Sequence, residues 1–392
     1  MQGFIKLPTL LASVTGGLFF AAGFFLFIQT NEPVELTLEE TNFVPVEIVE
    51  NTFEPAPSLP TSTPPAVVEE EVVEEPKIEV PIVEEPAEAT PVAAPIPKEE
   101  VVAPTPSYIP KDLEVVNAQV QKALVNILCI ADPISPVGSI SGSGIIIDPS
   151  GTILTNAHIA QTLLLKDYPS KDAISCTIRT GSPATPAYKA ELAYISPLWV
   201  VDNKEAIIQE NPVGTGKDDF ALLTITGPSE FGEMPESFPY IPMTFDEAAV
   251  GDVVISAGYP ASFLSADAIR RNLVQISAAG TIEDVFTFLQ TTPDVLSLGG
   301  VPLAQQGASG GAVVRSDGSL LGLVVTSSLE ENTQERDLRA ISTGHIARSF
   351  AIQHSANFGA FATGNITPEY ENFTANVAPQ LTELLLTVLG EI

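Results

Sequence analysis

The segment Gly142–His158, GSGIIIDPSGTILTNAH, decides the fold of this chain of 392 residues. Two short apolar runs flank Asp148-Pro149-Ser150-Gly151, residues typical of a tight turn, and a histidine follows the second run. The segment is therefore predicted to be a β-hairpin. Similar short runs, rich in Val, Ile and Leu, recur further along the chain between Gly, Pro, Asp and Ser. This spacing indicates an all-β sandwich or barrel.

Two later segments supply an aspartate and a serine: Asp219–Leu223 (DFALL) and Gly307–Gly311 (GASGG). A histidine, an aspartate and a serine in such settings are the parts of a nucleophilic serine site. The histidine takes the serine proton, and the carboxylate orients the histidine. We prefer Asp219 to Asp218 because Asp219 directly precedes an apolar strand, where it can be buried beside the imidazole. Asp218 is then expected to face solvent.

These segments resemble trypsin-like (chymotrypsin-fold) serine peptidases, most closely the bacterial HtrA/Deg type. Gly142–His158 is similar to the hairpin that delivers the histidine in that family. Tyr188–Leu192 with Asp219–Leu223 resembles the strand pair that delivers the aspartate, and Gly307–Gly311 resembles the serine loop. The resemblance covers roughly residues 112–355. It implies an all-β fold of two six-stranded antiparallel β-barrels with the site between them.

The resemblance also implies roles. His158 is the general base, Asp219 its orienting carboxylate and Ser309 the nucleophile, while the N–H groups of Gly307 and Ser309 form the oxyanion hole. The substrates are proteins or peptides, and the reaction needs no metal or cofactor. The implied substrate-binding residues carry no charge, which predicts a preference for small or medium apolar side chains: Leu303, Val324, Val325, Thr326 and Ser327.

The sequence departs from the family in several places. Ala308 stands where relatives usually carry a polar residue, and Ala312 replaces a common proline. The extra segment 201–217 separates the second strand pair from Asp219 and is expected to overhang the cleft. None of these changes removes a catalytic group. Too few residues follow His354 for a peptide-binding PDZ domain. Trimers are common among relatives, but no feature of the sequence shows an oligomer.

The N-terminal part predicts a membrane anchor and a spacer. No charged residue occurs between Lys6 and Glu32, an interval long enough to cross the membrane as a helix. The positive-inside rule places the N-terminus in the cytoplasm and the peptidase outside the cytoplasm, on a single-pass protein of the cell membrane. A cleaved signal peptide is the alternative. Residues 31–110 carry sixteen prolines, which favours a disordered, extended linker.

The net charge argues against one class of function, and the cysteine content leaves two possible states for the two cysteines. The net charge is −32, and residues 31–100 hold 18 Glu, two Lys and no Asp or Arg, a net of −16. Such an acidic chain lacks the basic surface that nucleic-acid binding requires. Cys129 and Cys176 form one disulfide in an oxidising compartment, or stay as two buried thiols.

Four segments are predicted: a transmembrane anchor (1–30), a Pro/Glu-rich linker (31–110), the peptidase domain (111–355) and a C-terminal tail with a short helix (356–392). Two other functions stay open. One is a peptidase fold kept as a non-catalytic binding or adhesion module, and the other is an envelope scaffold that depends on its spacer. An α/β-hydrolase esterase is disfavoured, because that fold places serine before histidine in the chain.

Overall fold

The computed structural model describes residues 108–209, 214–230, 232–288, 292–327, 336–363 and 367–390. The predicted membrane segment (1–30) and nearly all of the predicted linker (31–110) lie outside these residues. Within the described ranges, no helix combines the length and the apolar character needed to span a bilayer.

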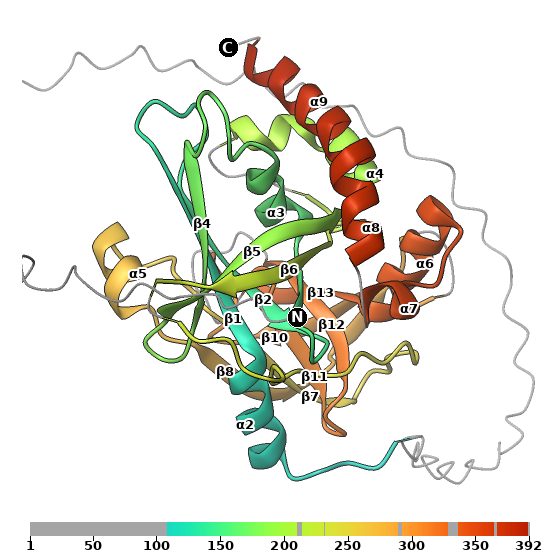
Figure 1. Ribbon diagram of the computed structural model, residues 1–392. Helices are drawn as coiled ribbons and strands as arrows, with labels where there is room; N and C mark the ends of the chain where they lie inside the picture. The colour runs from blue at the N-terminus through green and yellow to red at the C-terminus, as the bar shows by residue number, and fades with distance from the viewer. Residues whose placement is uncertain are drawn as a thin grey trace, which may run out of the picture. The chain divides into compact units, whose positions relative to one another are not determined.

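The first half of the described chain forms a closed six-stranded antiparallel barrel (Figure 1). Pairing of β1 with β4 closes the barrel, whose strand order is β1-β2-β3-β6-β5-β4. The hairpin expected from the sequence joins β2 to β3. At its turn, Gly151 has a φ of 96° and donates its N–H to the Asp148 carbonyl at 3.0 Å. The elements are α2 (Leu113–Ala123), β1 (Leu124–Ala131), β2 (Ile140–Ile146), β3 (Thr152–Thr155), α3 (Ala157–Leu164), β4 (Ile174–Thr180), β5 (Thr185–Ile195), α4 (Pro197–Asp202), the 3₁₀ helix η1 (Lys204–Ile208) and β6 (Ala221–Pro228).

The second half forms a seven-stranded antiparallel sheet in the order β8-β7-β11-β12-β13-β10-β9. The elements are β7 (Val253–Gly258), α5 (Ala266–Asn272), β8 (Ile276–Thr281), β9 (Asp284–Phe286), β10 (Val295–Gly300), β11 (Ala312–Arg315), β12 (Leu320–Ser327) and β13 (Asp337–Ser342).

This second sheet differs from the six-stranded closed barrel that the sequence predicted. Strands β8 and β9 lie at opposite edges, yet only Ile282 and Glu283 separate them in the chain. The Ile282 N–H donates to the Asp252 carbonyl at 3.0 Å, and the Glu283 N–H donates to the Ser297 carbonyl at 2.9 Å. A single strand that would close a six-stranded barrel is thus bent at these two residues and divided between the edges. Two antiparallel, barrel-like sheets are confirmed.

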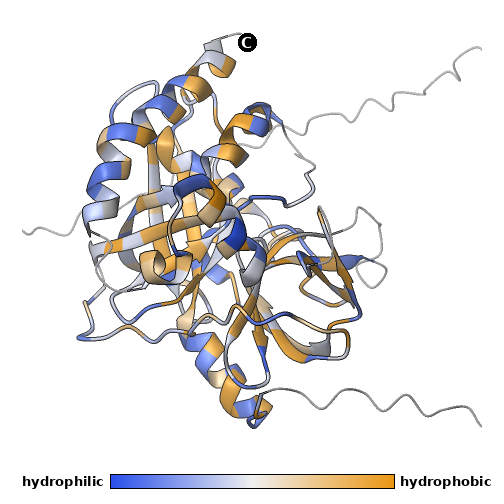
Figure 2. Cartoon of the chain, turned by 90° about the vertical axis from the view of Figure 1, so that its right-hand side faces the viewer, coloured by the Kyte–Doolittle hydropathy of each residue, from blue (hydrophilic) through white to orange (hydrophobic). Residues whose placement is uncertain are grey.

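The helix at the C-terminal end of the described chain packs on the first barrel. Leucine spacing predicts a helix over Pro379–Leu389, and the structure has α9 at Ala378–Gly390. Helix α9 contacts α3, α4 and η1, and Figure 1 shows it beside them. Figure 2 shows hydrophobic and hydrophilic residues alternating along its turns, as expected for a helix with one buried face. The other elements are α6 (Thr343–His354), α7 (Phe358–Ala362), α8 (Thr367–Asn372) and the π-helical turn η2 (Phe373–Val377).

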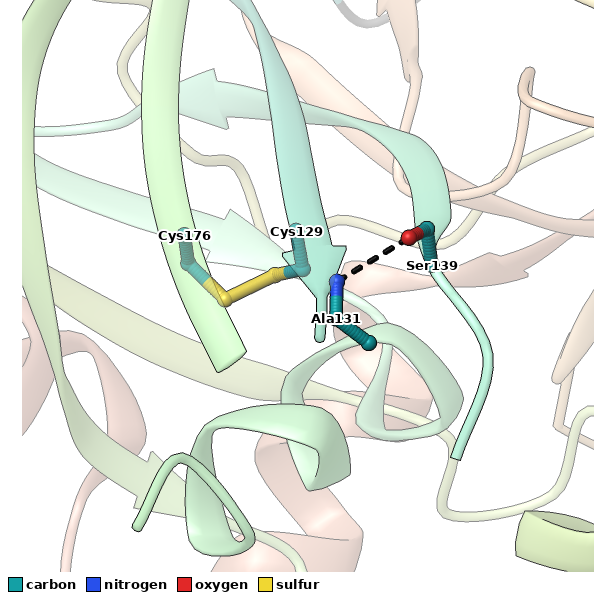
Figure 3. Close-up of a disulfide and its surroundings, with 4 residues drawn as sticks. All are labelled: Cys129, Ala131, Ser139 and Cys176. Atoms are coloured by element: carbon teal, nitrogen blue, oxygen red, sulfur yellow. Dashed lines mark hydrogen bonds between the residues drawn. A yellow bond between two sulfur atoms is a disulfide. The ribbon is translucent and has the colours of Figure 1, made fainter. Parts of the chain in front are cut away.

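Cys129 and Cys176 form a disulfide across neighbouring strands of the barrel (Figure 3). The two residues face each other in the β1–β4 register, with their Cα atoms 4.0 Å apart. Close to the bridge, the Ala131 N–H donates to the Ser139 hydroxyl at 3.0 Å. Of the two alternatives that the sequence left open, the structure has the bridge.

Candidate active site

His158 lies in the first turn of α3, directly after the hairpin. Its ring Nδ1 is 2.7 Å from Asp219 Oδ2, and its backbone N–H donates to Asp219 Oδ1 at 3.0 Å. One carboxylate therefore fixes both the main chain and the ring of the histidine. Because Nδ1 faces an acceptor, the proton of the neutral ring sits on Nδ1 and the Nε2 lone pair is left to accept a proton.

Asp219 enters the site from the turn before β6. The Asn156 side-chain amide donates to the Asp219 carbonyl at 2.9 Å, which ties this turn to the residue directly before α3. Asp219 is only 4 % exposed, as the apolar strand after it predicted. The expectation for its neighbour was wrong: Asp218 does not face solvent but is 5 % exposed, because its carboxylate is hydrogen-bonded to Ser349 on α6.

The environment of His158 raises its pKa above the ordinary value of 6.5. Burial works in the opposite direction, because it disfavours the charged ring. The negative charge of Asp219 and its hydrogen bond to Nδ1 together outweigh burial. Asp219 therefore makes His158 a stronger base, which suits it to take a proton from a hydroxyl.

Ser309 lies in the loop between β10 and β11, and hydrogen bonds on both sides hold that loop. The Gly310 N–H donates to the Val324 carbonyl at 2.8 Å, and the Ser143 N–H of the first barrel donates to the Ser309 carbonyl at 2.8 Å. The Ser309 hydroxyl lies 3.5 Å from the Val325 carbonyl. Among the described residues, no hydrogen bond joins this hydroxyl to His158. Such catalytic contacts are often long before substrate binds.

Glycine is required at two positions of the serine loop. Gly310 has a φ of 80°, and a Cβ there would lie 1.9 Å from the Ser143 carbonyl oxygen. Gly307 has a φ of 89°, and a Cβ there would lie 2.7 Å from the Tyr259 carbonyl oxygen. Both residues therefore need the left-handed conformation and the absence of a side chain.

A hydrogen bond to the Gln306 carbonyl fixes the orientation of the peptide before Gly307. The Gln306 carbonyl accepts a hydrogen bond from the Ala261 N–H at 2.7 Å. Because the carbonyl and the N–H of a trans peptide point in opposite directions, the Gly307 N–H points away from Ala261. Within the described ranges, neither this N–H nor that of Ser309 donates to a protein acceptor. Two backbone donors are thus left for a ligand oxygen.

Ser143 is a site residue that sequence reasoning missed. Its hydroxyl donates to the Gly307 carbonyl at 2.7 Å and accepts from the Tyr259 N–H at 2.8 Å. Its carbonyl accepts from the Thr155 hydroxyl at 2.8 Å. Ser143 therefore links β2 of the first barrel to the serine loop of the second sheet. Only its place in the Gly-Ser-Gly motif at the start of the hairpin could have singled it out.

The residues predicted to bind substrate lie along β12 and in the loop before the serine. Leu303 and Val324 are fully buried in the core of the second sheet, at 0 % and 1 % exposed, and Val325 is 5 % exposed. Thr326 and Ser327 continue β12 and pair with β13. The contribution of these residues to a substrate pocket stays a prediction. In the part of the chain that is described, no cluster of His, Cys, Asp or Glu is arranged to hold a metal ion.

The first barrel carries a histidine–aspartate pair and is joined at Ser143 to a second sheet with a glycine-rich serine loop, the arrangement expected of a serine peptidase. Residues 142–323 match the family described as "Trypsin-like peptidase domain". This matched segment, which holds His158, Asp219 and Ser309, is similar to trypsin-like peptidase domains and supports a serine endopeptidase. The crystal structure of the serine endoprotease from Yersinia pestis is similar, at 22% identity and a TM-score of 0.39, over 63% of this chain and 69% of that chain. No curated protein matches the sequence.

Proposed function

We propose that this chain hydrolyses peptide bonds in proteins through His158, Asp219 and Ser309. The observation that supports this assignment most directly is the double contact of one Asp219 carboxylate with the ring and the N–H of His158, at 2.7 and 3.0 Å. This contact leaves Nε2 as the basic nitrogen. A module that only bound peptides would not need a base oriented in this way.

The reaction follows from the positions of these groups. Ser309 Oγ turns from the Val325 carbonyl to His158 Nε2, transfers its proton there and forms a bond to the substrate carbonyl carbon. The oxygen of that carbonyl gains negative charge and is held by the N–H groups of Gly307 and Ser309. His158 then gives its proton to the leaving nitrogen as the C–N bond breaks. Water, deprotonated by the same histidine, releases the acyl group and regenerates Ser309.

Labelling of the full chain with a fluorophosphonate probe tests this proposal. The wild type is expected to be labelled on Ser309, and Ser309→Ala and His158→Gln are expected to abolish labelling. His354→Gln is the matched control, because this exposed histidine lies at the end of α6. A folded wild type that resists the probe would contradict the proposal and favour the alternative, a non-catalytic binding or adhesion module.

We also propose that the peptidase is exported and held at the membrane, with misfolded or cell-envelope proteins as substrates. The uncharged interval between Lys6 and Glu32 supports the anchor. The Cys129–Cys176 disulfide supports an oxidising compartment, since cytosolic proteins rarely keep such bridges. The prediction is that the full chain sediments with membranes after alkaline carbonate, and that added protease digests its peptidase domain in cells with a permeable wall and an intact membrane. A peptidase domain that is protected until the membrane is broken would overturn the proposed orientation.

A further inference from the structure

The turn that leads into Asp219 has a backbone conformation that side chains rarely adopt. Asp218 has a φ of 59°, and Gly216 has a φ of 78°. The Asp219 N–H donates to the Gly216 carbonyl at 3.2 Å, and the Phe220 N–H donates to the Asp218 carbonyl at 2.9 Å. Left-handed backbone at a residue other than glycine costs free energy, and it persists where the surroundings hold it in place.

Helix α6 holds this turn through the side chain of Asp218. Oδ1 of Asp218 accepts a hydrogen bond from the Ser349 hydroxyl at 2.5 Å and lies 3.7 Å from His345 Nε2. Burial alone would raise the pKa of Asp218, but its contacts with His345 and Ser349 lower it. The carboxylate is therefore charged and firmly bound at neutral pH.

The same helix is held by the second sheet. His345 Nδ1 lies 3.2 Å from Oδ1 of Asp294, the residue directly before β10. Arg348 also donates to Asp294 Oδ1, at 2.7 Å. The buried His345 ring therefore lies between a carboxylate of the first barrel and a carboxylate of the second sheet. These two units carry His158 and Ser309 respectively.

Helix α6 also reaches the residue on the other side of Asp219. The Phe220 carbonyl accepts from the Ser196 N–H at 3.2 Å, and the Ser196 hydroxyl donates to Gln353 Oε1 at 3.2 Å. Gln353 in turn donates to the Ser349 hydroxyl at 2.9 Å. Both neighbours of Asp219 are thus connected to one helix by buried or half-buried polar contacts.

We propose that Asp218 and His345 are positioning residues: together they fix the turn that aims Asp219 at His158 and set this pair relative to Ser309 on the second sheet. The inference rests on the proposed function. Neither residue touches substrate. Each acts through Asp219, so their loss should slow the chemical step and leave substrate binding largely unchanged.

Two substitutions at position 218 of the full chain distinguish the role of the Asp218 side chain from that of its backbone conformation. Asp218→Gly keeps the left-handed turn and removes the anchor, and we expect kcat and the labelling rate of Ser309 to fall by about 10- to 100-fold, with KM little changed. Asp218→Asn still accepts from Ser349 and tolerates the turn, so it should recover the rate to within roughly threefold of the wild type. Ile352→Ala is the control, an exposed residue of the same helix.

A proton NMR measurement tests the positioning without any catalysis. The Nδ1–H of His158, hydrogen-bonded to Asp219, is expected as a downfield resonance in the wild type and in Asp218→Asn. It should be weakened or lost in Asp218→Gly and in His345→Leu. An unchanged resonance together with an unchanged labelling rate in Asp218→Gly would overturn the inference. A wild type that shows the resonance but no labelling would contradict the proposed function alone.

Discussion

At the scale of single residues, Asp219 sets the proton affinity of His158. The raised pKa of His158 means that the ring stays protonated to a higher pH than an ordinary histidine. Only the neutral ring can take the proton of Ser309, so activity should rise with pH through a midpoint above 6.5. The stability that the His158–Asp219 pair contributes changes with pH in the opposite direction to activity. The ion pair stabilises the fold fully below the unfolded pKa, and this contribution is lost as pH rises through the folded pKa.

Substitution of Asp219 by Asn tests this argument. The variant loses the negative charge that raises the pKa of His158, so the ring should titrate at a lower pH than in the wild type. We expect kcat to fall by about 10⁴-fold, because the amide no longer selects the tautomer with a free Nε2. NMR titration of the ring and the pH dependence of labelling would measure both effects. An unchanged midpoint would show that Asp219 is not the partner that controls His158.

A second prediction concerns Ser143, whose hydroxyl joins Gly307 to Tyr259. Ser143→Ala leaves a carbonyl and an N–H without their partner, which should cost about 1–3 kcal/mol in the free energy of unfolding. It should also slow labelling of Ser309, because the peptide that supplies the oxyanion donor loses a support. Ser139→Ala is the matched control, since that exposed hydroxyl accepts a hydrogen bond from the Ala131 N–H at the surface. Equal urea midpoints for the two variants would argue against this role.

The sequence reveals His158, Asp219 and Ser309 because each stands in a short motif with a known chemical setting. It does not reveal the partners of Ser143 or of Asp218. Those contacts join residues that are 164 and 131 positions apart, and local spacing carries no information about such pairs. The wrong expectation for Asp218 has this cause: the carboxylate is buried by a helix that follows the second sheet.

At the scale of elements, the local sequence pattern predicts the hairpin and the terminal helix, but it does not predict how the second sheet ends at its edges. Turn residues and apolar runs predict the β2–β3 hairpin, and leucine spacing predicts α9. The division of one strand into β8 and β9 depends on the hydrogen bonds of Ile282 to Asp252, directly before β7, and of Glu283 to Ser297 of β10. No turn signal marks these two residues. The pairing of Cys129 with Cys176 likewise required the β1–β4 register.

The disulfide carries a prediction at this scale. It joins residues 47 positions apart, and closing a loop of that length should stabilise the folded chain by about 4 kcal/mol. The double variant Cys129→Ala/Cys176→Ala should therefore unfold at lower urea concentration than the oxidised wild type. Reductant should lower the midpoint of the wild type and leave that of the variant unchanged. Coincident unfolding curves for the oxidised wild type and the variant would contradict the expected stabilisation.

At the scale of the whole described domain, the two sheets meet through polar contacts on either side of the site. Ser143 links them at the serine loop, and His345 links them behind Asp219. Arg179 of β4 adds a third link, since its guanidinium donates to the Asn126 side chain and to the carbonyls of Ile269 and Arg270 in α5. The groups proposed for catalysis come from different sheets, and their relative positions therefore depend on contacts distant from the proposed reacting atoms.

The C-terminal helices also support the site through contacts distant from it. Phe358 of α7 packs against Phe220, the residue after Asp219, with ring centroids 5.8 Å apart. Leu381 and Leu385 of α9 are buried in the same core as the first barrel. The described helices after residue 355 thus pack on the first barrel, and the domain boundary at residue 355 stays a prediction.

A chain that ends at Ser355 tests whether the peptidase domain needs the C-terminal helices. It would expose the apolar surface that Phe358, Leu381 and Leu385 cover, and each buried side chain of this kind contributes about 1.5–3 kcal/mol. We expect the truncated chain to unfold at clearly lower temperature and to lose labelling of Ser309 together with its fold, because Phe220 loses its support. Leu385→Ala in the full chain should lower the free energy of unfolding by about 2–5 kcal/mol, less than the truncation does. Gln380→Ala, on the exposed face of α9, should leave the free energy of unfolding almost unchanged. A truncated chain that matches the full chain in melting temperature and labelling rate would show that residues 111–355 suffice as the folded unit, with the helices packed on it as an addition.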